Sequence, residues 1–378
     1  MLPVRIPTVL IVSTAVLAVL TACTSAKSGP AVPVSSSVVV TVSTVPSEPA
    51  GSSAVPNASP TTAAESSLVV TRTKPAVRPT TTKQSVPRGN GTDPLTGGRL
   101  SLNPVIAAKI DNTYFQVAQF GVAEADVVFV EQVEGGLTRL IAIFHSNLPA
   151  EVGPIRSVRS TDAQLLPVFG KPGLVFSGGA GGPLTALAAT PIVDTTNVGD
   201  AYFRSDLATG TYNLHADLSR IADQAKGLSP AKSIGLNFSA SPTQAANGTK
   251  VGSVQVVMQA GKTDFAYTGG HFVRLRHGEP VKDYSGKVQA ADNVVVQHIV
   301  DEPDGTVDSI GSPSYLSKTV GSGKVTLYRD GRTVQGTWKR DKNTAAFSYS
   351  DAGGRPLLFK PGRTWVLLAP QSAVVTVG

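Results

Sequence analysis

Two apolar runs flank a pair of glycines in residues 126–145, which read DVVFVEQVEGGLTRLIAIFH. Residues 126–132 and 137–145 each predict a strand, because β-branched and other apolar residues dominate both runs. Gly135 and Gly136 suit the tight turn of a hairpin. The stretch therefore predicts two antiparallel strands joined at Val133–Gly136.

Helical and strand patterns mix on both sides of this hairpin, up to about residue 245. The predicted strands are 105–110 and 174–176, and the predicted helical segments are 121–125, 157–169, 184–189 and 214–226. After residue 245 the pattern is almost wholly that of strands: 254–258, 272–276, 294–300, 324–328, 333–339, 345–349 and 364–368. The sequence therefore predicts an α+β fold, with a mixed αβ first domain at 94–245 and a β-rich second domain at 246–378. Their junction is expected near 240–252, where Ser, Ala, Gln and Asn cluster.

The first 23 residues have the pattern of a bacterial lipoprotein signal. Arg5 precedes an apolar run from Ile6 to Leu20, which is shorter than the ~20 residues of a membrane-spanning helix. The run ends in Leu20-Thr21-Ala22-Cys23, and Cys23 is the only cysteine of the chain. We therefore predict a signal peptide at 1–22 and an acylated Cys23 that anchors the protein outside the cell membrane.

Residues 23–93 are predicted to form a disordered tether. Ser, Thr, Pro, Ala and Val dominate the stretch, and no helical or strand period persists. Its later part is basic, which suits a solvated, extended chain or contact with an anionic surface. Whether the Ser/Thr-rich tether carries O-linked glycans stays open.

The formal net charge of +7 does not indicate nucleic-acid binding. Arg5 contributes one charge, the tether has six basic and three acidic residues, and the rest of the chain has 26 basic and 23 acidic residues. A nucleic-acid site needs basic residues clustered on a fold. The single cysteine also excludes a disulfide scaffold and, once acylated, cysteine catalysis.

Few residues suggest chemistry. Arg156 and Arg159, spaced i and i+3 at the start of a predicted helix, suit a clamp for a carboxylate or phosphate. Glu131 and Glu134 lie near Arg139, so a salt bridge competes with acid–base catalysis. The glycine-rich loop at Ser177, Gly178 and Gly179 could bind an anion through backbone N–H groups, and Ser177 is a weak nucleophile candidate.

The five histidines are scattered and lack metal-ligand spacing, so we expect neither a metal nor a cofactor. His215 lies among polar residues and is a weak catalytic candidate, as is Glu134. The ligand-binding prediction thus comprises Arg139, Arg156, Arg159, Gly178 and Gly179.

A series of motifs resembles the YerB-type family of bacterial lipoproteins, a two-part domain of unknown function. The series in order is Lys109-Ile110-Asp111-Asn112, Val133-Glu134-Gly135-Gly136-Leu137-Thr138-Arg139, Gly153-Pro154-Ile155-Arg156-Ser157-Val158-Arg159, Phe176-Ser177-Gly178-Gly179 and, later, Pro361-Gly362-Arg363-Thr364-Trp365. The resemblance covers nearly everything after residue 93. It implies a lipid-anchored envelope protein, and the family has no settled activity. One departure is Tyr212-Asn213-Leu214-His215, where the family usually has a proline before Asn-Leu.

Three functions follow as alternatives. The first is non-catalytic binding of a partner protein or an anionic cell-wall component. The second is an enzyme acting on cell-wall glycan or peptide, and the third is a solute-binding lipoprotein. A solute-binding lipoprotein must dock on a permease in the same membrane. A long tether lowers the local concentration of the protein at that permease, so the third alternative ranks last.

Overall fold

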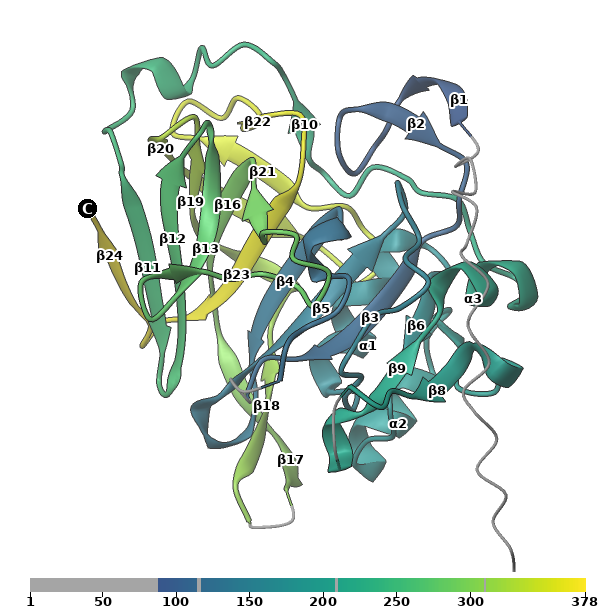
Figure 1. Ribbon diagram of the computed structural model, residues 1–378. Coiled ribbons are helices and arrows are strands. Elements are labelled where there is room, and N and C mark those ends of the chain that lie inside the picture. Colours follow the sequence, from purple (N-terminus) through teal and green to yellow (C-terminus); the bar gives the residue numbers. More distant parts are fainter. Residues whose placement is uncertain (1–87, 114–116, 208–209, 309–310) are drawn as a thin grey trace, which may run out of the picture. The chain divides into compact units, whose positions relative to one another are not determined.

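The computed structural model describes residues 88–113, 117–207, 210–308 and 311–378. The predicted signal peptide, Cys23 and the tether up to residue 87 lie outside the described residues. β-strands dominate the described part, and its helices are short (Figure 1). The fold is therefore β-rich, and helices contribute less to the first half than the sequence predicts.

A ten-stranded mixed sheet forms the centre of the fold. Its strands, in spatial order, are β21 (Ser348–Asp351), β20 (Arg332–Arg340), β19 (Gly321–Arg329), β16 (Asn293–Ile299), β23 (Thr364–Pro370), β4 (Val127–Gln132), β5 (Thr138–Phe144), β3 (Ile106–Asp111), β6 (Gly173–Val175) and β7 (Val193–Asp194). Parallel pairing of β23 with β4 joins strands from the two halves of the sequence. The predicted hairpin is confirmed: β4 and β5 pair antiparallel, and Gly135 and Gly136 have positive φ in the turn between them.

Both faces of the large sheet are buried, which explains the continuous apolar runs in its strands. Along β4, Val127 and Phe129 belong to one hydrophobic cluster, while Val128 and Val130 belong to a second. Because successive side chains of a strand point to opposite faces, each cluster covers one face of the sheet. We call these the first and the second face.

A smaller sheet packs on the second face, where it contributes Val254, Val256 and Phe265. Its strands are β14 (Glu279–Pro280), β13 (His271–Arg276), β12 (Gly261–Thr268), β11 (Ser253–Met258), β24 (Val374–Val377) and β15 (Ala290–Ala291). Four two-stranded pairs complete the β-structure: β1 (Arg88–Thr92) with β2 (Arg99–Ser101), β8 (Tyr202–Arg204) with β9 (Leu214–Ala216), β10 (Asn237–Phe238) with β22 (Leu358–Phe359), and β17 (Asp301–Val307) with β18 (Pro313–Ser317).

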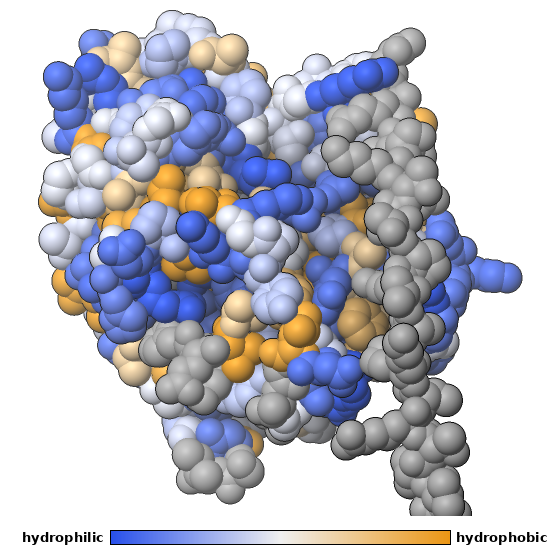
Figure 2. Space-filling model, in the orientation of Figure 1, coloured by the Kyte–Doolittle hydropathy of each residue, from blue (hydrophilic) through white to orange (hydrophobic). Residues whose placement is uncertain are grey.

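The α-helices of the described residues are α1 (Ser160–Leu165), α2 (Gly181–Ala188) and α3 (Leu218–Gln224). Leu165 and Leu187 bring α1 and α2 to the first face, and Leu218 and Ile221 bring α3 to the second. Short 3₁₀ turns are η1 (Val122–Glu124), η2 (Glu134–Gly136), η3 (Leu166–Phe169), η4 (Gly199–Ala201), η5 (Gly210–Tyr212) and η6 (Ala245–Asn247). On the surface shown in Figure 2, hydrophilic residues predominate and apolar ones gather in small groups.

Several predicted segments differ from the structure. The helix predicted at 157–169 begins only at Ser160 as α1 and ends in the 3₁₀ turn η3, so Arg156 and Arg159 precede the helix. The helix predicted at 214–226 begins only at Leu218, because Leu214–Ala216 pairs with β8 and Asp217 caps the helix by accepting the backbone N–H of Arg220 at 3.1 Å. Strand β1 lies inside the stretch predicted to be a tether, because it pairs with β2. The structured part therefore begins by residue 88.

The predicted division between residues 245 and 246 stays a prediction, although strands from both sides of it share the large sheet. No helix within the described ranges is both long and apolar enough to span a membrane.

Candidate functional site

The candidate site lies at one edge of the large sheet, where strands of common direction end. Strands β16, β23 and β4 run parallel, and β3 and β6 run the same way as β4 because β5 lies antiparallel between β4 and β3. Ligands of sheets with parallel strands commonly bind beyond the carboxyl ends of those strands. At this edge, β3 ends at Asp111, while Glu134 follows β4 and Ser177 follows β6.

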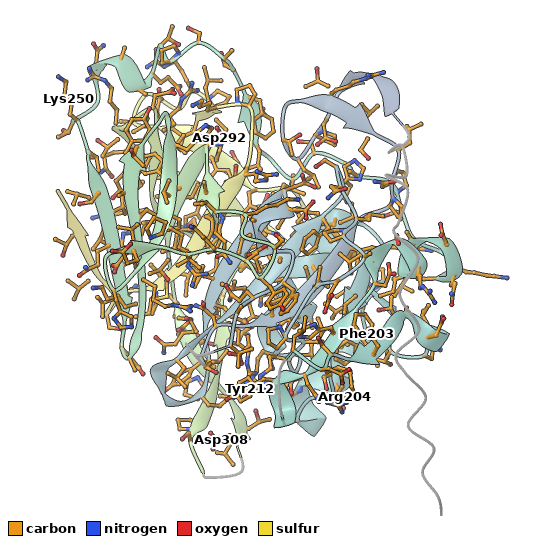
Figure 3. The ribbon with its side chains drawn as sticks, in the orientation of Figure 1. Phe203, Arg204, Tyr212, Lys250, Asp292 and Asp308 are labelled. Carbon is orange, nitrogen blue, oxygen red and sulfur yellow. The ribbon has the colours of Figure 1, made fainter. Side chains whose placement is uncertain are left out.

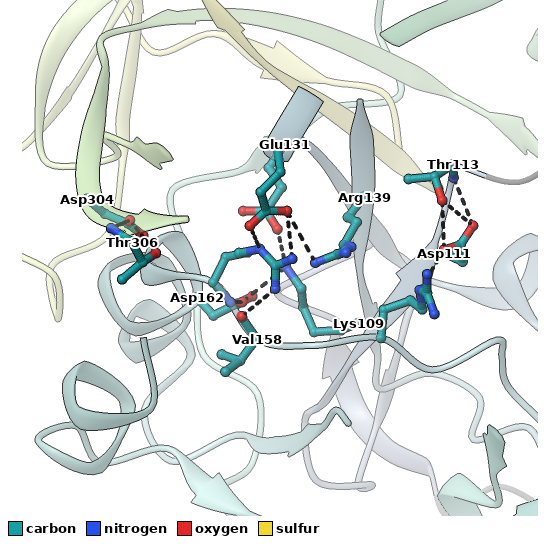
Figure 4. A network of polar contacts seen from close by, with 12 residues as sticks. Lys109, Asp111, Thr113, Glu131, Arg139, Val158, Asp162, Asp304 and Thr306 are labelled. Atoms are coloured by element: carbon teal, nitrogen blue, oxygen red, sulfur yellow. Dashed lines mark hydrogen bonds and ion pairs between the residues drawn. The ribbon is translucent and has the colours of Figure 1, made fainter. Parts of the chain in front are cut away.

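Arg139 occupies the middle of a polar row across three strands. It lies opposite Asp111 of β3 and opposite Glu131 of β4, so the three side chains share the first face. Figure 4 shows Arg139 between Glu131 and Asp111. Arg156 and Arg159, from the segment before α1, pair with Asp111 and Glu134 at the same place. The sheet and this segment therefore bring the three predicted arginines together; we call them the arginine cluster.

Glu134 is held as an anion by Arg159. The Arg159 Nε lies 2.6 Å from one carboxylate oxygen of Glu134, and Nη2 donates to the other at 2.7 Å. Burial acts to raise the pKa of Glu134, but the hydrogen bond and charge of Arg159 outweigh burial and lower it below its usual range. A carboxylate held ionised is unsuited to act as a general acid.

Arg156 is oriented by Asp111 and Tyr212. Its Nε lies 2.7 Å from a carboxylate oxygen of Asp111, and its guanidinium lies 4.8 Å from the centre of the Tyr212 ring. Tyr212 belongs to the connection between β8 and β9 (Figure 3). Such a cation–π contact fixes the plane of the guanidinium.

Arg139 has the weakest pairing of the three arginines. Its Nη1 lies 4.0 Å from Glu134, and within the described residues neither Nε nor Nη1 has a hydrogen-bond partner. Burial, followed by the positive charges of Arg159 and Arg156, lowers the pKa of Arg139 to about 10. Arg139 is therefore a nearly buried cation with N–H groups still available to an anion.

A fully buried ion pair network supports the arginine cluster. Lys109 contacts Glu131 and lies 3.0 Å from Asp162. Asp162 also accepts the backbone N–H of Arg159 at 2.7 Å, which fixes that residue at the start of α1. Burial raises the pKa of Asp162, and the charge of Glu131 adds to the rise while Lys109 opposes it.

The glycine-rich loop lies beside the arginine cluster. The N–H of Ser177 donates to the carbonyl of Arg156, and the N–H of Val158 donates to the carbonyl of Gly178, both at 3.0 Å. Gly178 has φ of 64°, and a Cβ on Gly179 would come within 2.6 Å of Val158. Both positions therefore need glycine.

His215 contacts residues outside the arginine cluster. It pairs with Glu151 at 2.6 Å and packs against Gly153, where a Cβ would lie 2.4 Å from the imidazole. The imidazole also packs against the rings of Phe120 and Phe203, with ring centres 4.5 and 6.1 Å apart. In the described residues none of these partners belongs to the arginine cluster.

Sequence reasoning missed the buried support of the cluster. Lys109, Asp111 and Asp162 are not among the residues proposed for chemistry, and Glu131 is proposed there as a catalytic carboxylate or a partner of Arg139, not of Lys109. Polar residues at the ends of apolar strands, such as Lys109 and Asp111 in 106–111, are the signal that could have found them. In the described residues no group of three or more His, Cys, Asp or Glu side chains could hold a metal ion.

The fold and the cluster define a class: a two-part, β-rich protein whose halves share one sheet and whose charged side chains gather at its carboxyl edge. Residues 92–231 match the N-terminal domain of a family described as protein of unknown function (DUF3048), and residues 254–366 match its C-terminal domain. The chain belongs to this two-part, YerB-type family.

Two relatives agree with the assignment. "Putative lipoprotein YerB" of Bacillus subtilis (strain 168) is 27% identical over 299 residues, which are 74% of this chain and 86% of the relative. A crystal structure of the YerB protein from Bacillus subtilis superposes with a TM-score of 0.63 at 23% identity, covering 76% of this chain and 99% of the solved one. The structural likeness shows the fold, and the family's description assigns no activity.

Proposed function

We propose that the chain is a lipid-anchored protein of the cell envelope that binds an anionic wall component, or an acidic group of an envelope protein, through Arg139, Arg156 and Arg159. The predicted signal at 1–22 and acylation of Cys23 place it outside the membrane, and the relative named as a lipoprotein supports this location. The α+β first half carries the cluster, and the predicted tether precedes it.

One observation carries the proposal: Arg139 is nearly buried beside two further arginines and has two nitrogen atoms without a hydrogen-bond partner in the described structure. Asp111 orients Arg156, and Glu134 orients Arg159. Among the described residues, no carboxylate lies within 3.5 Å of the Arg139 guanidinium. A buried donor without a partner is costly, so an incoming carboxylate or phosphate gains charge-assisted hydrogen bonds there. No feature of the described residues favours catalysis over binding.

The test measures binding of polyglycerol phosphate to the full chain in detergent micelles by isothermal titration calorimetry. Arg139→Gln should weaken binding about 10- to 100-fold, because a hydrogen bond to a charged group contributes about 1.5–3 kcal/mol. Raising the salt concentration should weaken binding of the unmodified protein as well.

Arg355→Gln is the matched control, since Arg355 is 75% exposed and pairs only with Asp351 at the surface. It should leave the affinity unchanged. Equal affinities for Arg139→Gln and the unmodified chain, with this probe and with a polyglutamate peptide, would contradict the proposal.

A further inference from the structure

A pocket opens at the same edge of the sheet as the arginine cluster, further along that edge. Its lining includes the ends of three adjacent parallel strands: β4 ends at Gln132, β23 ends at Pro370, and Val300 follows β16. The pocket has a volume of about 270 Å³, slightly below the ~300–1,000 Å³ typical for drug-sized ligands. Its size therefore suits one small ring.

Gln132 is the observation that points to a ligand. The residue is 2% exposed, yet its Oε1 has no hydrogen-bond partner in the described part of the chain. Buried polar atoms almost always have a partner, and leaving one without costs free energy. A hydroxyl group in the pocket would donate to this oxygen.

The other lining groups complete a surface for a sugar. The amides of Gln259 and Gln371 each donate and accept hydrogen bonds, and Asp301 accepts them. Val300, which is 45% exposed, and the ring of Tyr315 supply apolar contact for the C–H groups of a pyranose. No arginine or lysine lines the pocket, so its chemistry differs from that of the arginine cluster.

Two contacts make this pocket a built part of the fold. A Cβ on Gly136 would lie 2.6 Å from the Cβ of Gln259, and the N–H of Ala260 donates to the carbonyl of Gly136 at 3.1 Å. The turn between β11 and β12 therefore packs on η2, the same turn that carries Glu134. Burial, with a smaller contribution from the Glu131 charge, raises the pKa of Asp301 to about 6, which leaves it mostly ionised at neutral pH.

We propose that this pocket binds a neutral sugar ring, with Gln132 and Asp301 accepting its hydroxyl hydrogens and Tyr315 contacting its apolar side. The inference does not depend on the arginine cluster, since the two sites share no lining residue. A glycan with anionic substituents would be able to contact both.

The test titrates methyl β-galactoside and methyl N-acetyl-β-glucosaminide into the full chain in detergent, with saturation-transfer NMR as the readout. Gln132→Met should weaken binding of at least one sugar about three- to tenfold, the loss of one hydrogen bond. Its thermal midpoint should stay equal or rise, because the variant removes a buried oxygen without a partner. Loss of binding together with unchanged or higher stability is the signature of a ligand-binding group.

Asn197→Ala is the matched control, because Asn197 lines a separate pocket near α3 and should not affect sugar binding. If Gln132→Met fails to fold, Gln371→Ala, at an exposed lining residue, replaces it.

Two outcomes would overturn the inference. One is the absence of binding of either sugar, or binding that Gln132→Met does not change. The other is binding of lysine amide in place of sugars, abolished by Asp301→Asn, which would identify a pocket for cationic peptides.

Discussion

Asp93 and His145 form a buried ion pair at the first tight turn of the described chain. The His145 Nε2 lies 3.1 Å from the Asp93 carboxylate, and both side chains are almost fully buried. Although burial acts to raise the pKa of Asp93, the hydrogen bond from His145 and the N–H groups of Leu95 and Ser101 lower it to about 2. Burial likewise acts against the charge of His145, but Asp93 raises the pKa of His145 above its usual value.

These shifts predict a pH window for stability. Asp93 contributes to the free energy of unfolding above its usual pKa, and this contribution disappears as the pH falls toward about 2. His145 contributes below its usual pKa, and its contribution disappears as the pH rises through its raised pKa. Asp93→Asn should therefore lower the free energy of unfolding by about 3 kcal/mol near pH 5.5 and by less near pH 9. Urea denaturation at both pH values measures the difference.

Asp341→Asn is the control for this pair, because Asp341 is 74% exposed and pairs with Lys339 at the surface. It should change stability by less than about 0.5 kcal/mol at either pH. A loss for Asp93→Asn that is the same at both pH values would show that His145 is not the partner that matters.

At the residue scale, the sequence predicts chemical types better than their surroundings. The spacing of Arg156 and Arg159 predicts a shared side of a helix, whereas both residues precede α1 and Arg159 has extended backbone. Ion pairs with Asp111 and Glu134 bring them beside Arg139 instead. His215 pairs with Glu151 and packs against Gly153, contacts that proximity in sequence to Asn213 and Asp217 could not show.

At the element scale, α1 is held by the second half of the chain. The Gln164 side chain accepts the N–H of Thr319 at 2.6 Å and that of Val320 at 3.0 Å. Arg340, at the end of β20, donates to the carbonyls of Gln164 and Leu165 at 3.2 and 3.0 Å. These are carbonyls at the end of a helix, which have no partner within the helix itself. A helix of six residues is not stable alone, so these contacts explain how α1 persists.

Replacement of Arg340 should therefore destabilise the whole fold. Arg340 is 1% exposed. In Arg340→Met, the two carbonyls and the hydroxyl of Thr319 would each lose one hydrogen-bond donor. We expect a loss of about 3 kcal/mol in the free energy of unfolding, measured by urea denaturation. Lys339→Met, at an adjacent position that is 68% exposed, should cost less than about 0.5 kcal/mol. Equal effects of the two variants would show that the contacts at α1 do not matter.

Element boundaries were predictable where local chemistry decides them. The glycine pair after β4 forms the predicted turn. Asp330-Gly331, a dipeptide typical of hairpin turns, likewise connects β19 and β20. Leu214–Ala216 was predicted as helix because its apolar spacing continues into α3, whereas pairing with β8 makes it a strand. Pairing with another strand is a tertiary contact that periodicity does not contain.

At the scale of the whole molecule, the central sheet joins two halves that the sequence presents as successive domains. The β-rich character and most strands of the second half follow from their patterns. The pairing of β23 with β4 could not be predicted, because nothing local to Thr364–Pro370 specifies a partner so distant in sequence. The pocket lined by Gln132, Val300 and Pro370 exists only once this pairing forms.

A shared sheet predicts that the two halves unfold together. Trp338 and Trp365, the only tryptophans, both lie in the second half, whereas Ile141 lies in β5 of the first half and is fully buried. Ile141→Ala should lower stability by about 2–5 kcal/mol through the cavity it leaves. Because β4 links β5 to β23, tryptophan fluorescence and backbone circular dichroism should shift to the same lower urea midpoint. Val374→Ala, at a side chain that is 60% exposed, should shift neither signal. If Ile141→Ala lowers the urea midpoint measured by circular dichroism but not the one measured by tryptophan fluorescence, the halves are independent domains divided near residue 245. The carboxyl edge of the large sheet would then not depend on cooperative folding.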